Sequence, residues 1–189
     1  MMNHNHLTRV LDVFLSMAGI IIFFPPLVFV LIIIEMLYGK SIFIQQRVGF
    51  KQKPFRIFKI RTMKSSTKDQ SSHFIKPNDL MPYGKILRVT KLDELPQLVN
   101  ILFGQMSFVG PRPCLPQQKS VIKEREKRGV FNARPGLTGF SQIRKVDMSH
   151  PRKLARLDKL LIKKLNLTIY LGLIVATILG KGLGDRIKR

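Results

Sequence analysis

The sequence has little of what builds a disulfide-bonded or zinc-binding protein. Its 189 residues include one cysteine, Cys114, with four histidines and no tryptophan. A single cysteine excludes a disulfide framework, and with so few histidines it also excludes a Cys/His zinc site. A lone thiol is typical of a protein in a reducing compartment.

Acidic residues are also scarce. Eleven Asp and Glu stand against 33 Lys and Arg, which gives a formal net charge of +22. The apolar fraction of 45% is ordinary for a folded chain, so disorder through lack of core residues is excluded for most of the sequence. This excess of positive charge needs an anionic partner: nucleic acid, an anionic membrane surface or a phosphorylated small molecule.

Formal charge is missing altogether from residues 13–34, which lie between Asp12 and Glu35. A helix of this length would measure roughly 33 Å, enough to cross the apolar core of a bilayer. The stretch is too long for a secretory signal and has no A-x-A-like site after it. Because it is apolar on every face, a buried helix of a soluble protein is disfavoured.

Pro25 and Pro26 lie in the middle of this apolar stretch. They remove two backbone donors, so we expect two short helices of about 12 and 8 residues with a bend between them. A kinked span and a re-entrant hairpin both fit. Residues 1–39 hold one basic residue and residues 40–189 hold the other 32, which places the basic part in the cytoplasm. The expected division is a membrane segment, 1–39, and a cytoplasmic domain, 40–189.

The second part is expected to be mainly α-helical with one small β-hairpin. The hairpin strands are residues 41–47 and 55–61, which alternate partly around a Gly- and Pro-containing turn. Residues 65–79 are polar and predict a loop, and residues 85–103 are mainly helical. The remaining elements are a short charged helix and two rigid Pro/Gly segments: 124–129, 110–116 and 134–139.

Two further helices are expected near the C-terminal end. Residues 151–165 form a basic amphipathic pattern with an apolar face of Leu154, Leu157, Leu161 and Leu165. Such a helix lies either on a membrane surface or against the core with its basic face in water, and the pattern favours neither. Residues 167–179 are apolar but too short to span, so they belong to the core or to the interface.

The most informative acidic residues are the adjacent pair Asp93 and Glu94. Apolar residues from Leu92 to Leu102 follow a helical spacing, with Asp93 as the expected N-cap and Pro96 at the third helical position. One interpretation is structural, with a cap followed by an exposed first-turn residue. The other is a phosphate site, because several cations lie in segments that could converge on the pair: Lys59, Arg61, Arg88, Lys91 and Arg112.

A carboxylate pair among cations suits phosphoryl chemistry. One carboxylate can attack phosphorus, as in enzymes with an aspartyl-phosphate intermediate. The other can bind Mg²⁺, which prefers one or two carboxylates together with substrate phosphates. Arginine side chains would then spread the charge of the transferring group.

Five stretches, in order along the chain, resemble the bacterial sugar transferases, the monotopic polyprenol-phosphate phosphoglycosyl transferases. They are QRVG at 46–49, FRIFKIRTM at 55–63, LDELPQLVN at 92–100, MSFVGPRP at 106–113, and RPGLTG at 134–139 with Gln142. The resemblance extends from the apolar segment to about residue 184. It implies transfer of a sugar 1-phosphate from a UDP-sugar to a membrane polyprenol phosphate, such as undecaprenyl phosphate, with release of UMP.

The resemblance also implies roles for individual residues. Asp93 corresponds to the nucleophile that forms a covalent phosphosugar intermediate, and Glu94 to the Mg²⁺ ligand. Further residues are expected to bind phosphate or substrate: Lys59, Arg61, Arg88, Arg112, Pro113, Arg134, Gln142 and Asp158. The family's re-entrant helix breaks at a Ser-Pro step, here Pro25-Pro26, so the proline is kept and the serine is lost. The family's Gly-Arg-Asn after the last glycine motif is also absent, which leaves the sugar open.

The expected protein is therefore a membrane enzyme with a re-entrant helix at Pro25 and Pro26, both termini in the cytoplasm and interfacial amphipathic helices. It would act at the cytoplasmic face of the bacterial inner membrane, in a first step of surface polysaccharide, lipopolysaccharide or glycoconjugate synthesis. No nucleic-acid partner is expected, and both a monomer and a homo-oligomer fit the sequence. The main alternative is a membrane-tethered protein that binds nucleic acid or anionic lipid without catalysis. A catalytically silent scaffold is disfavoured by the presence of Asp93, Glu94, Lys59 and Arg112 together.

Overall fold

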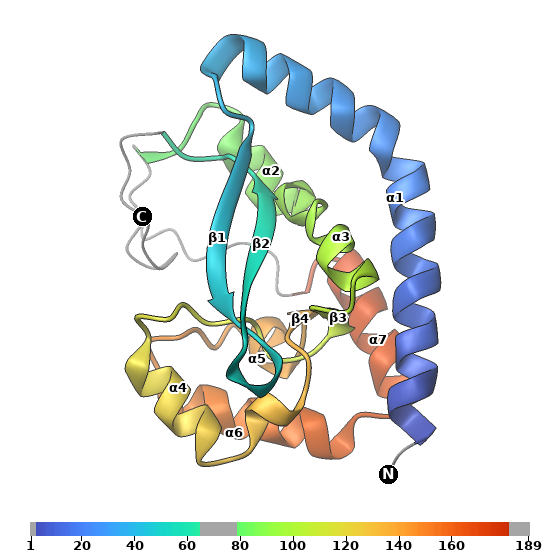
Figure 1. Ribbon diagram of the computed structural model, residues 1–189, viewed down its shortest axis with the longest axis vertical. Coiled ribbons are helices and arrows are strands. Elements are labelled where there is room, and N and C mark those ends of the chain that lie inside the picture. The colour runs from blue at the N-terminus through green and yellow to red at the C-terminus, as the bar shows by residue number, and fades with distance from the viewer. Residues whose placement is uncertain (1–2, 65–78, 182–189) are drawn as a thin grey trace.

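The computed structural model describes residues 3–64 and 79–181. A long N-terminal helix, α1, lies along one side of the molecule beside a β-hairpin and a group of shorter helices (Figure 1). The predicted mainly helical fold with a small hairpin is confirmed. The predicted loop at 65–79 lies almost entirely outside the described residues.

In chain order the main elements are α1 (Asn3–Tyr38), β1 (Ile42–Val48), β2 (Pro54–Ile60), α2 (Gly84–Thr90), α3 (Gln97–Leu102), β3 (Ser107–Val109), α4 (Lys119–Glu126), β4 (Gly136–Thr138), α5 (Phe140–Ile143), α6 (Pro151–Lys164) and α7 (Leu167–Ile178).

Helix α1 is one continuous helix with Pro25 and Pro26 inside it, so the prediction of two separate short helices was wrong. Its axis bends along its course, and the second part turns over the top of the hairpin (Figure 1). Prolines are the usual cause of such a bend, because each removes a backbone hydrogen bond and crowds the preceding turn. The bend is present, but the helical conformation continues through it.

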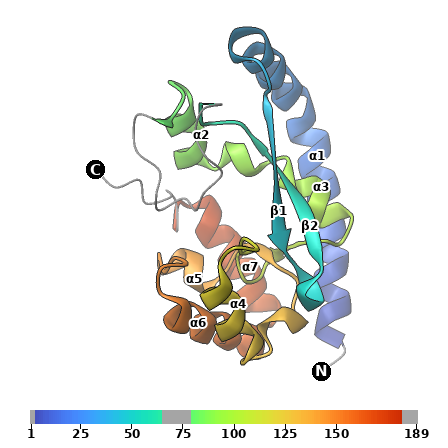
Figure 2. The same ribbon diagram turned by 60° about the vertical axis from the view of Figure 1, so that its left-hand side comes forward.

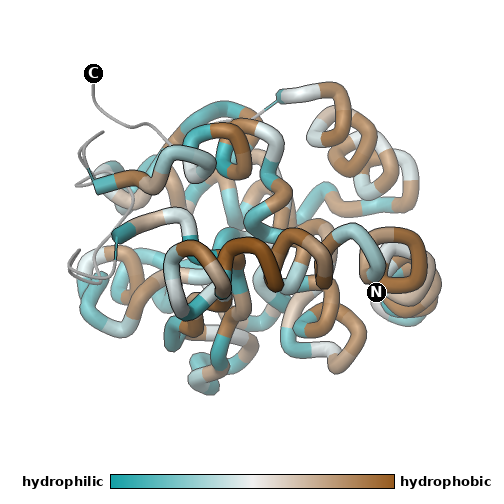
Figure 3. The backbone as a smooth tube through the Cα atoms, turned by 90° about the horizontal axis from the view of Figure 1, so that it is seen from above, coloured by the Kyte–Doolittle hydropathy of each residue, from teal (hydrophilic) through white to brown (hydrophobic). Residues whose placement is uncertain are grey.

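Residues 6–38 of α1 form the one helix, among the described residues, that is long and apolar enough to cross a membrane. Only 6% of its most apolar window is buried in the protein, which a core helix of a soluble protein would not show. Hydrophobic colouring dominates this helix when the backbone is coloured by hydropathy (Figure 3).

The β-hairpin was predicted correctly. β1 and β2 pair antiparallel over their full length, from Ile42 opposite Ile60 to Val48 opposite Pro54. Between them Phe50–Gln52 form a 3-10 turn, in which Lys51 and Gln52 have positive φ angles. Ile57 of β2 is buried in a core cluster with Leu98, Ile101 and Met106, so the hairpin is anchored on α3.

The predicted turn at 134–139 contains a strand that the sequence did not reveal. β4 pairs in parallel with β3, with Ser107 opposite Gly136 and Val109 opposite Thr138. Gly136 of β4 lies so close to Gly110, the residue after β3, that a Cβ atom on Gly136 would lie 2.0 Å from the backbone nitrogen of Gly110. Two of the five sequence motifs therefore meet at this pair.

Helices α4, α5, α6 and α7 gather at the end of the molecule opposite α2 (Figure 2). Helix α6 buries Leu154 and Leu161 and exposes its basic residues, as a helix packed on the core does. Its apolar face is therefore turned into the protein. Helix α7 buries Tyr170 and Leu173 but exposes Leu171, Val175 and Ile178.

A buried carboxylate fixes α1 on this domain. The Oδ1 atom of Asp12 accepts hydrogen bonds from the Tyr170 hydroxyl at 2.7 Å, the Ser107 hydroxyl at 3.0 Å and the Phe108 amide at 2.9 Å. One turn earlier, Arg9 donates to the carbonyls of Ile101 and Leu102, both at 2.6 Å, at the end of α3. These contacts attach the first part of α1 to β3, α3 and α7 at once.

We expect Tyr170→Phe to lower the free energy of unfolding by about 1–3 kcal/mol, because it removes a buried donor to the Asp12 carboxylate. Burial raises the pKa of Tyr170, so the hydroxyl keeps its proton and acts as the donor. Thermal melting in detergent, followed by circular dichroism, measures the loss. Tyr38→Phe makes the same chemical change at a side chain that is 40% exposed and should stay within about 0.5 kcal/mol. Equal melting of the two variants would contradict the role of the Asp12 contacts.

Candidate functional site

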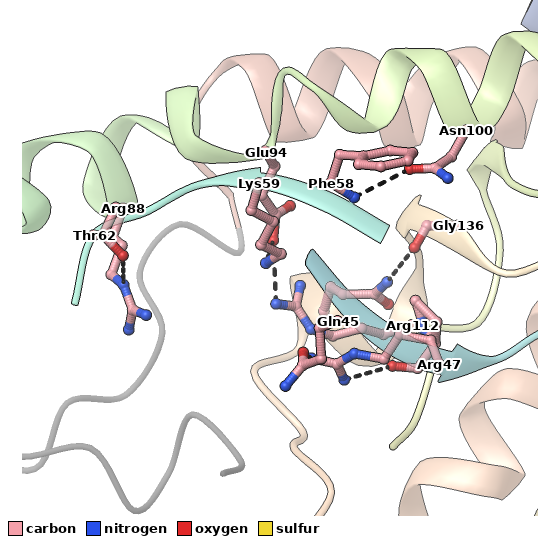
Figure 4. Close-up of polar contacts among 12 residues, drawn as sticks. Gln45, Arg47, Phe58, Lys59, Thr62, Arg88, Glu94, Asn100, Arg112 and Gly136 are labelled. Atoms are coloured by element: carbon pink, nitrogen blue, oxygen red, sulfur yellow. Dashed lines mark hydrogen bonds and ion pairs between the residues drawn. The ribbon is translucent and has the colours of Figure 1, made fainter. Parts of the chain in front are cut away.

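Glu94 is the centre of the site. Its Oε1 atom lies 2.7 Å from Nζ of Lys59 and 3.2 Å from Nη2 of Arg112. Lys59 is on β2, Glu94 on the 3-10 turn Leu92–Glu94, and Arg112 on the segment after β3. Figure 4 shows the three side chains close together. One carboxylate oxygen thus joins three separate parts of the chain.

The electrostatics of Glu94 follow from this geometry. Burial by itself raises the pKa of a carboxyl group, but Lys59 and Arg112 outweigh that effect, and Lys91 adds to theirs. Together they hold the pKa of Glu94 well below its ordinary value. The carboxylate is therefore ionised throughout the neutral range.

The local fold of the acidic pair differs from the prediction. Helix α2 ends at Lys91, which adopts a left-handed conformation with φ 59° and ψ 16°. The chain then makes the 3-10 turn Leu92–Glu94, and α3 begins only after Pro96, which is its N-cap. Asp93 is thus not the N-cap of a helix. The left-handed Lys91, two residues earlier, ends α2, and α3 begins only after its N-cap Pro96. It is 6% exposed, next to Glu94.

The predicted site residue Arg88 lies on α2 and contacts the chain just after β2. The Nε atom of Arg88 donates to the Thr62 hydroxyl at 2.8 Å, just beyond the end of β2 (Figure 4). Thr62 is itself fixed, because its carbonyl accepts from the amide of Met81 at 3.0 Å. The predicted site residue Arg61 lies beside Thr62, and its carbonyl accepts from the Tyr83 hydroxyl at 3.0 Å.

Three other predicted site residues, Gln142, Asp158 and Arg134, make contacts that do not include Glu94. Gln142 donates to the carbonyl of Gly110 at 3.4 Å, and Asp158 is fully buried with Arg125 as its ion-pair partner. Arg134 is exposed, donates to the carbonyl of Gly104 at 2.9 Å and stacks on the Phe50 ring. The structure thus joins Lys59 and Arg112 to Glu94 by direct contacts, whereas Gln142, Asp158 and Arg134 make their contacts elsewhere.

Sequence reasoning missed the residues that hold this site together. Thr62 orients Arg88, and Arg47 donates to the carbonyl of Pro113 at 3.0 Å. Arg125 donates to the carbonyl of Arg112 at 2.8 Å. Arg47 lies inside the QRVG motif, which was a usable signal. Arg125 stood in an ordinary charged helix, and only its contacts single it out.

A model of the bacterial sugar transferase family matches residues 3–181. The chain belongs to this family. The match includes α1, the hairpin, the acidic pair and the segments on either side of the β3–β4 pair. The relationship implied by the five motifs is therefore confirmed over nearly the whole sequence.

Several relatives carry names that state a reaction. The chain is 38% identical over 141 residues to a UDP-glucose:undecaprenyl-phosphate glucose-1-phosphate transferase of Caulobacter vibrioides, which covers 72% of this chain and 53% of the relative. An enzyme of the same name from Escherichia coli is 35% identical over 72% of this chain and 31% of the relative. A UDP-N-acetylgalactosamine-undecaprenyl-phosphate N-acetylgalactosaminephosphotransferase of Aeromonas hydrophila is 31% identical over 71% of this chain and 33% of the relative. The chain thus spans about half or a third of the length of these relatives.

Proposed function

We propose that the protein transfers a sugar 1-phosphate from a UDP-sugar to undecaprenyl phosphate or a similar polyprenol phosphate and releases UMP. The observation that carries the proposal is the Asp93–Glu94 pair, in which Glu94 contacts Lys59 and Arg112. The named relatives act on UDP-sugars and undecaprenyl phosphate, which supports the same substrate classes here. Because those relatives differ in their sugar, and the family's Gly-Arg-Asn is absent, the proposal leaves the sugar open.

In the first step the Asp93 carboxylate attacks the phosphorus that carries the sugar. A bond forms between this oxygen and phosphorus, and the bond from phosphorus to the bridging oxygen of the diphosphate breaks. The bridging oxygen leaves with the electron pair as part of UMP. In this proposal Lys59 and Arg112, which contact Glu94, and Arg88, which contacts Thr62, would balance the negative charge that spreads over the phosphate oxygens.

In the second step an oxygen of the polyprenol phosphate attacks the same phosphorus. The bond from phosphorus to Asp93 breaks, which restores the carboxylate and gives the polyprenyl-diphosphate-sugar. A dianionic acceptor phosphate needs no base to remove a proton. The two steps therefore require a nucleophile and charge balance, which the acidic pair and its cations supply.

The donor atoms at Glu94 fit a magnesium ion. Among the described residues both cation contacts of Glu94 are made by Oε1, so we propose Oε2 as the oxygen for a further ligand. Among the described residues no group of three or more His, Cys, Asp or Glu side chains forms a complete protein cage. Mg²⁺ is usually held by one or two carboxylates plus substrate phosphates, which matches Glu94 with a bound diphosphate. Such an ion would neutralise phosphate charge as UMP leaves.

The apolar surface favours attachment to a membrane. Exposed apolar residues lie along α1, and others lie on or near α2, α3 and α7. In that second group the most exposed are Ile178 at 77%, Leu179 at 75% and Phe103 at 75%. Helix α6 contributes its basic side chains rather than its leucine face. We propose that α1 enters the cytoplasmic face of the inner membrane, bends at Pro25 and Pro26, and returns to the same face.

The alternative of a basic protein that only binds nucleic acid or anionic lipid is not favoured. Such a binder needs its cations free for phosphates along the surface. Here Lys59 and Arg112 instead form ion pairs with the carboxylate of Glu94. A binder would keep its affinity for DNA after both acidic residues are neutralised, whereas a transferase would lose turnover.

We expect Asp93→Asn to lower UMP release by at least about 10³-fold, because an amide cannot form the phosphosugar ester. The assay uses the protein in detergent with Mg²⁺, undecaprenyl phosphate and a panel of UDP-sugars. Asp147→Asn makes the same change in a surface turn, where Asp147 contacts Ser149, and should retain activity. An active Asp93→Asn variant would overturn the nucleophile assignment, and a wild-type protein inactive with every UDP-sugar would overturn the proposed function.

The re-entrant path of α1 predicts that both of its ends are in the cytoplasm. In spheroplasts a membrane-impermeant maleimide should label neither Asn3→Cys nor Lys40→Cys, and permeabilised cells should show both. Cys114 gives little background, because it is fully buried and burial raises the pKa of its thiol, which favours the less reactive protonated form. Labelling of the Asn3→Cys variant from outside would instead show that α1 spans the membrane.

A further inference from the structure

The segment that carries Arg112 is held by its carbonyl groups. Pro111 and Pro113 on either side of Arg112 have no backbone N–H, so this segment offers few donors of its own. Yet each carbonyl from residue 110 to residue 114 accepts a hydrogen bond from another part of the chain. The donors, in order, are Gln142 Nε2 at 3.4 Å, the Gly136 amide at 2.9 Å, Arg125 Nη1 at 2.8 Å, Arg47 Nη1 at 3.0 Å and the Val48 amide at 2.9 Å.

The carbonyl of Arg112 itself accepts from Arg125, the largest fully buried side chain among the described residues. Arg125 also pairs with Asp158: its Nε donates to Oδ2 at 2.9 Å, and its Nη2 lies 2.8 Å from the same oxygen as an ion-pair contact. The other oxygen of Asp158 accepts from the Ser141 hydroxyl at 3.0 Å. The backbone of Arg112 is thus connected through Arg125 to α6 and α5, while its side chain reaches Glu94.

Burying a guanidinium and a carboxylate is costly, and such a pair adds little stability over well-packed apolar residues. It does supply what apolar residues cannot, which is a rigid, directional donor for a single carbonyl. A displacement of about 1 Å at a group that positions substrate can lower a rate on the order of 10²-fold. The buried pair lies where it can prevent such a displacement of Arg112.

We propose that Arg125, held by Asp158 and assisted by Arg47, is a positioning residue that fixes Arg112 against Glu94. This inference rests on the proposed function for its kinetic consequence, but its geometric claim does not. It also assigns Asp158 a place behind the site, where it orients Arg125 rather than touching substrate. Arg47, on β1, holds the next carbonyl, that of Pro113, in the same way.

A double-mutant cycle in the UMP-release assay tests the coupling. Arg125→Gln would leave Asp158 buried without its partner, so the variant used is Arg125→Gln with Asp158→Asn, which removes both charges. We expect it to lower kcat/KM about 10- to 100-fold in the wild-type background, but less than about threefold when Arg112 is already alanine. Arg47→Lys, at a partly exposed residue, should show the same pattern with a smaller loss. Arg128→Gln is the control: Arg128 is a partly buried arginine that pairs with Glu124 of α4, and the variant should stay within about twofold of wild type.

Relaxation of the arginine Nε–H signals by NMR gives a readout that does not need activity. We expect the order parameter of Arg112 to fall below about 0.6 in the Arg125→Gln/Asp158→Asn variant and to stay near the wild-type value in Arg128→Gln. Arg47→Lys provides the second test if the first variant does not fold. The inference would be overturned if the losses in kcat/KM of the two changes were additive. It would also be overturned if the order parameter of Arg112 stayed high in both the Arg125→Gln/Asp158→Asn and the Arg47→Lys variants. A wild-type protein without UMP release would overturn the proposed function, and the NMR result would still decide the positioning role.

Discussion

The structure of the site depends on one carboxylate oxygen that two cations share. Oε1 of Glu94 contacts Lys59 from the hairpin and Arg112 from the segment after β3, so three parts of the chain meet at one charge. The side chain of Glu94 is 12% exposed, that of Lys59 15% and that of Arg112 27%, so water compensates these charges only in part and each depends on the others. This mutual dependence fixes the distance between the hairpin and the Arg112 segment. Asp93 is the buried residue beside Glu94 in the same 3-10 turn.

The rest of the fold holds these parts in place from behind. Arg125 and Arg47 bind the carbonyls of Arg112 and Pro113, and the close approach of Gly110 and Gly136 joins the two glycine motifs. On the opposite side Asp12 attaches α1 to β3 and α7. The apolar helix is therefore attached to the same framework that carries the site. Such an arrangement would hold the reacting groups at a fixed height relative to a membrane, where a lipid phosphate is found.

Local patterns predicted much of this protein, and long-range contacts account for what they missed. The hairpin and α6 followed from alternation and from leucine spacing, and the acidic pair stood out because carboxylates are rare in a chain of +22. Strands β3 and β4 have three residues each, too few for a pattern, and their pairing joins residues far apart in sequence. Asp93 was wrongly predicted as an N-cap, because a left-handed residue is usually a glycine and here it is Lys91. Arg125 could not be recognised as a buried residue, because the sequence of a charged helix does not show which of its basic side chains faces the core.

The proposed reaction depends on Asp93, which would carry the sugar phosphate between donor and acceptor. Mass spectrometry of the intact protein tests it directly, after incubation with a UDP-sugar that supports turnover, with Mg²⁺ and without polyprenol phosphate. We expect a mass increase of one sugar phosphate, located on the peptide that contains Asp93 and lost when undecaprenyl phosphate is added. Turnover without any such adduct, or an adduct on another residue, would contradict it.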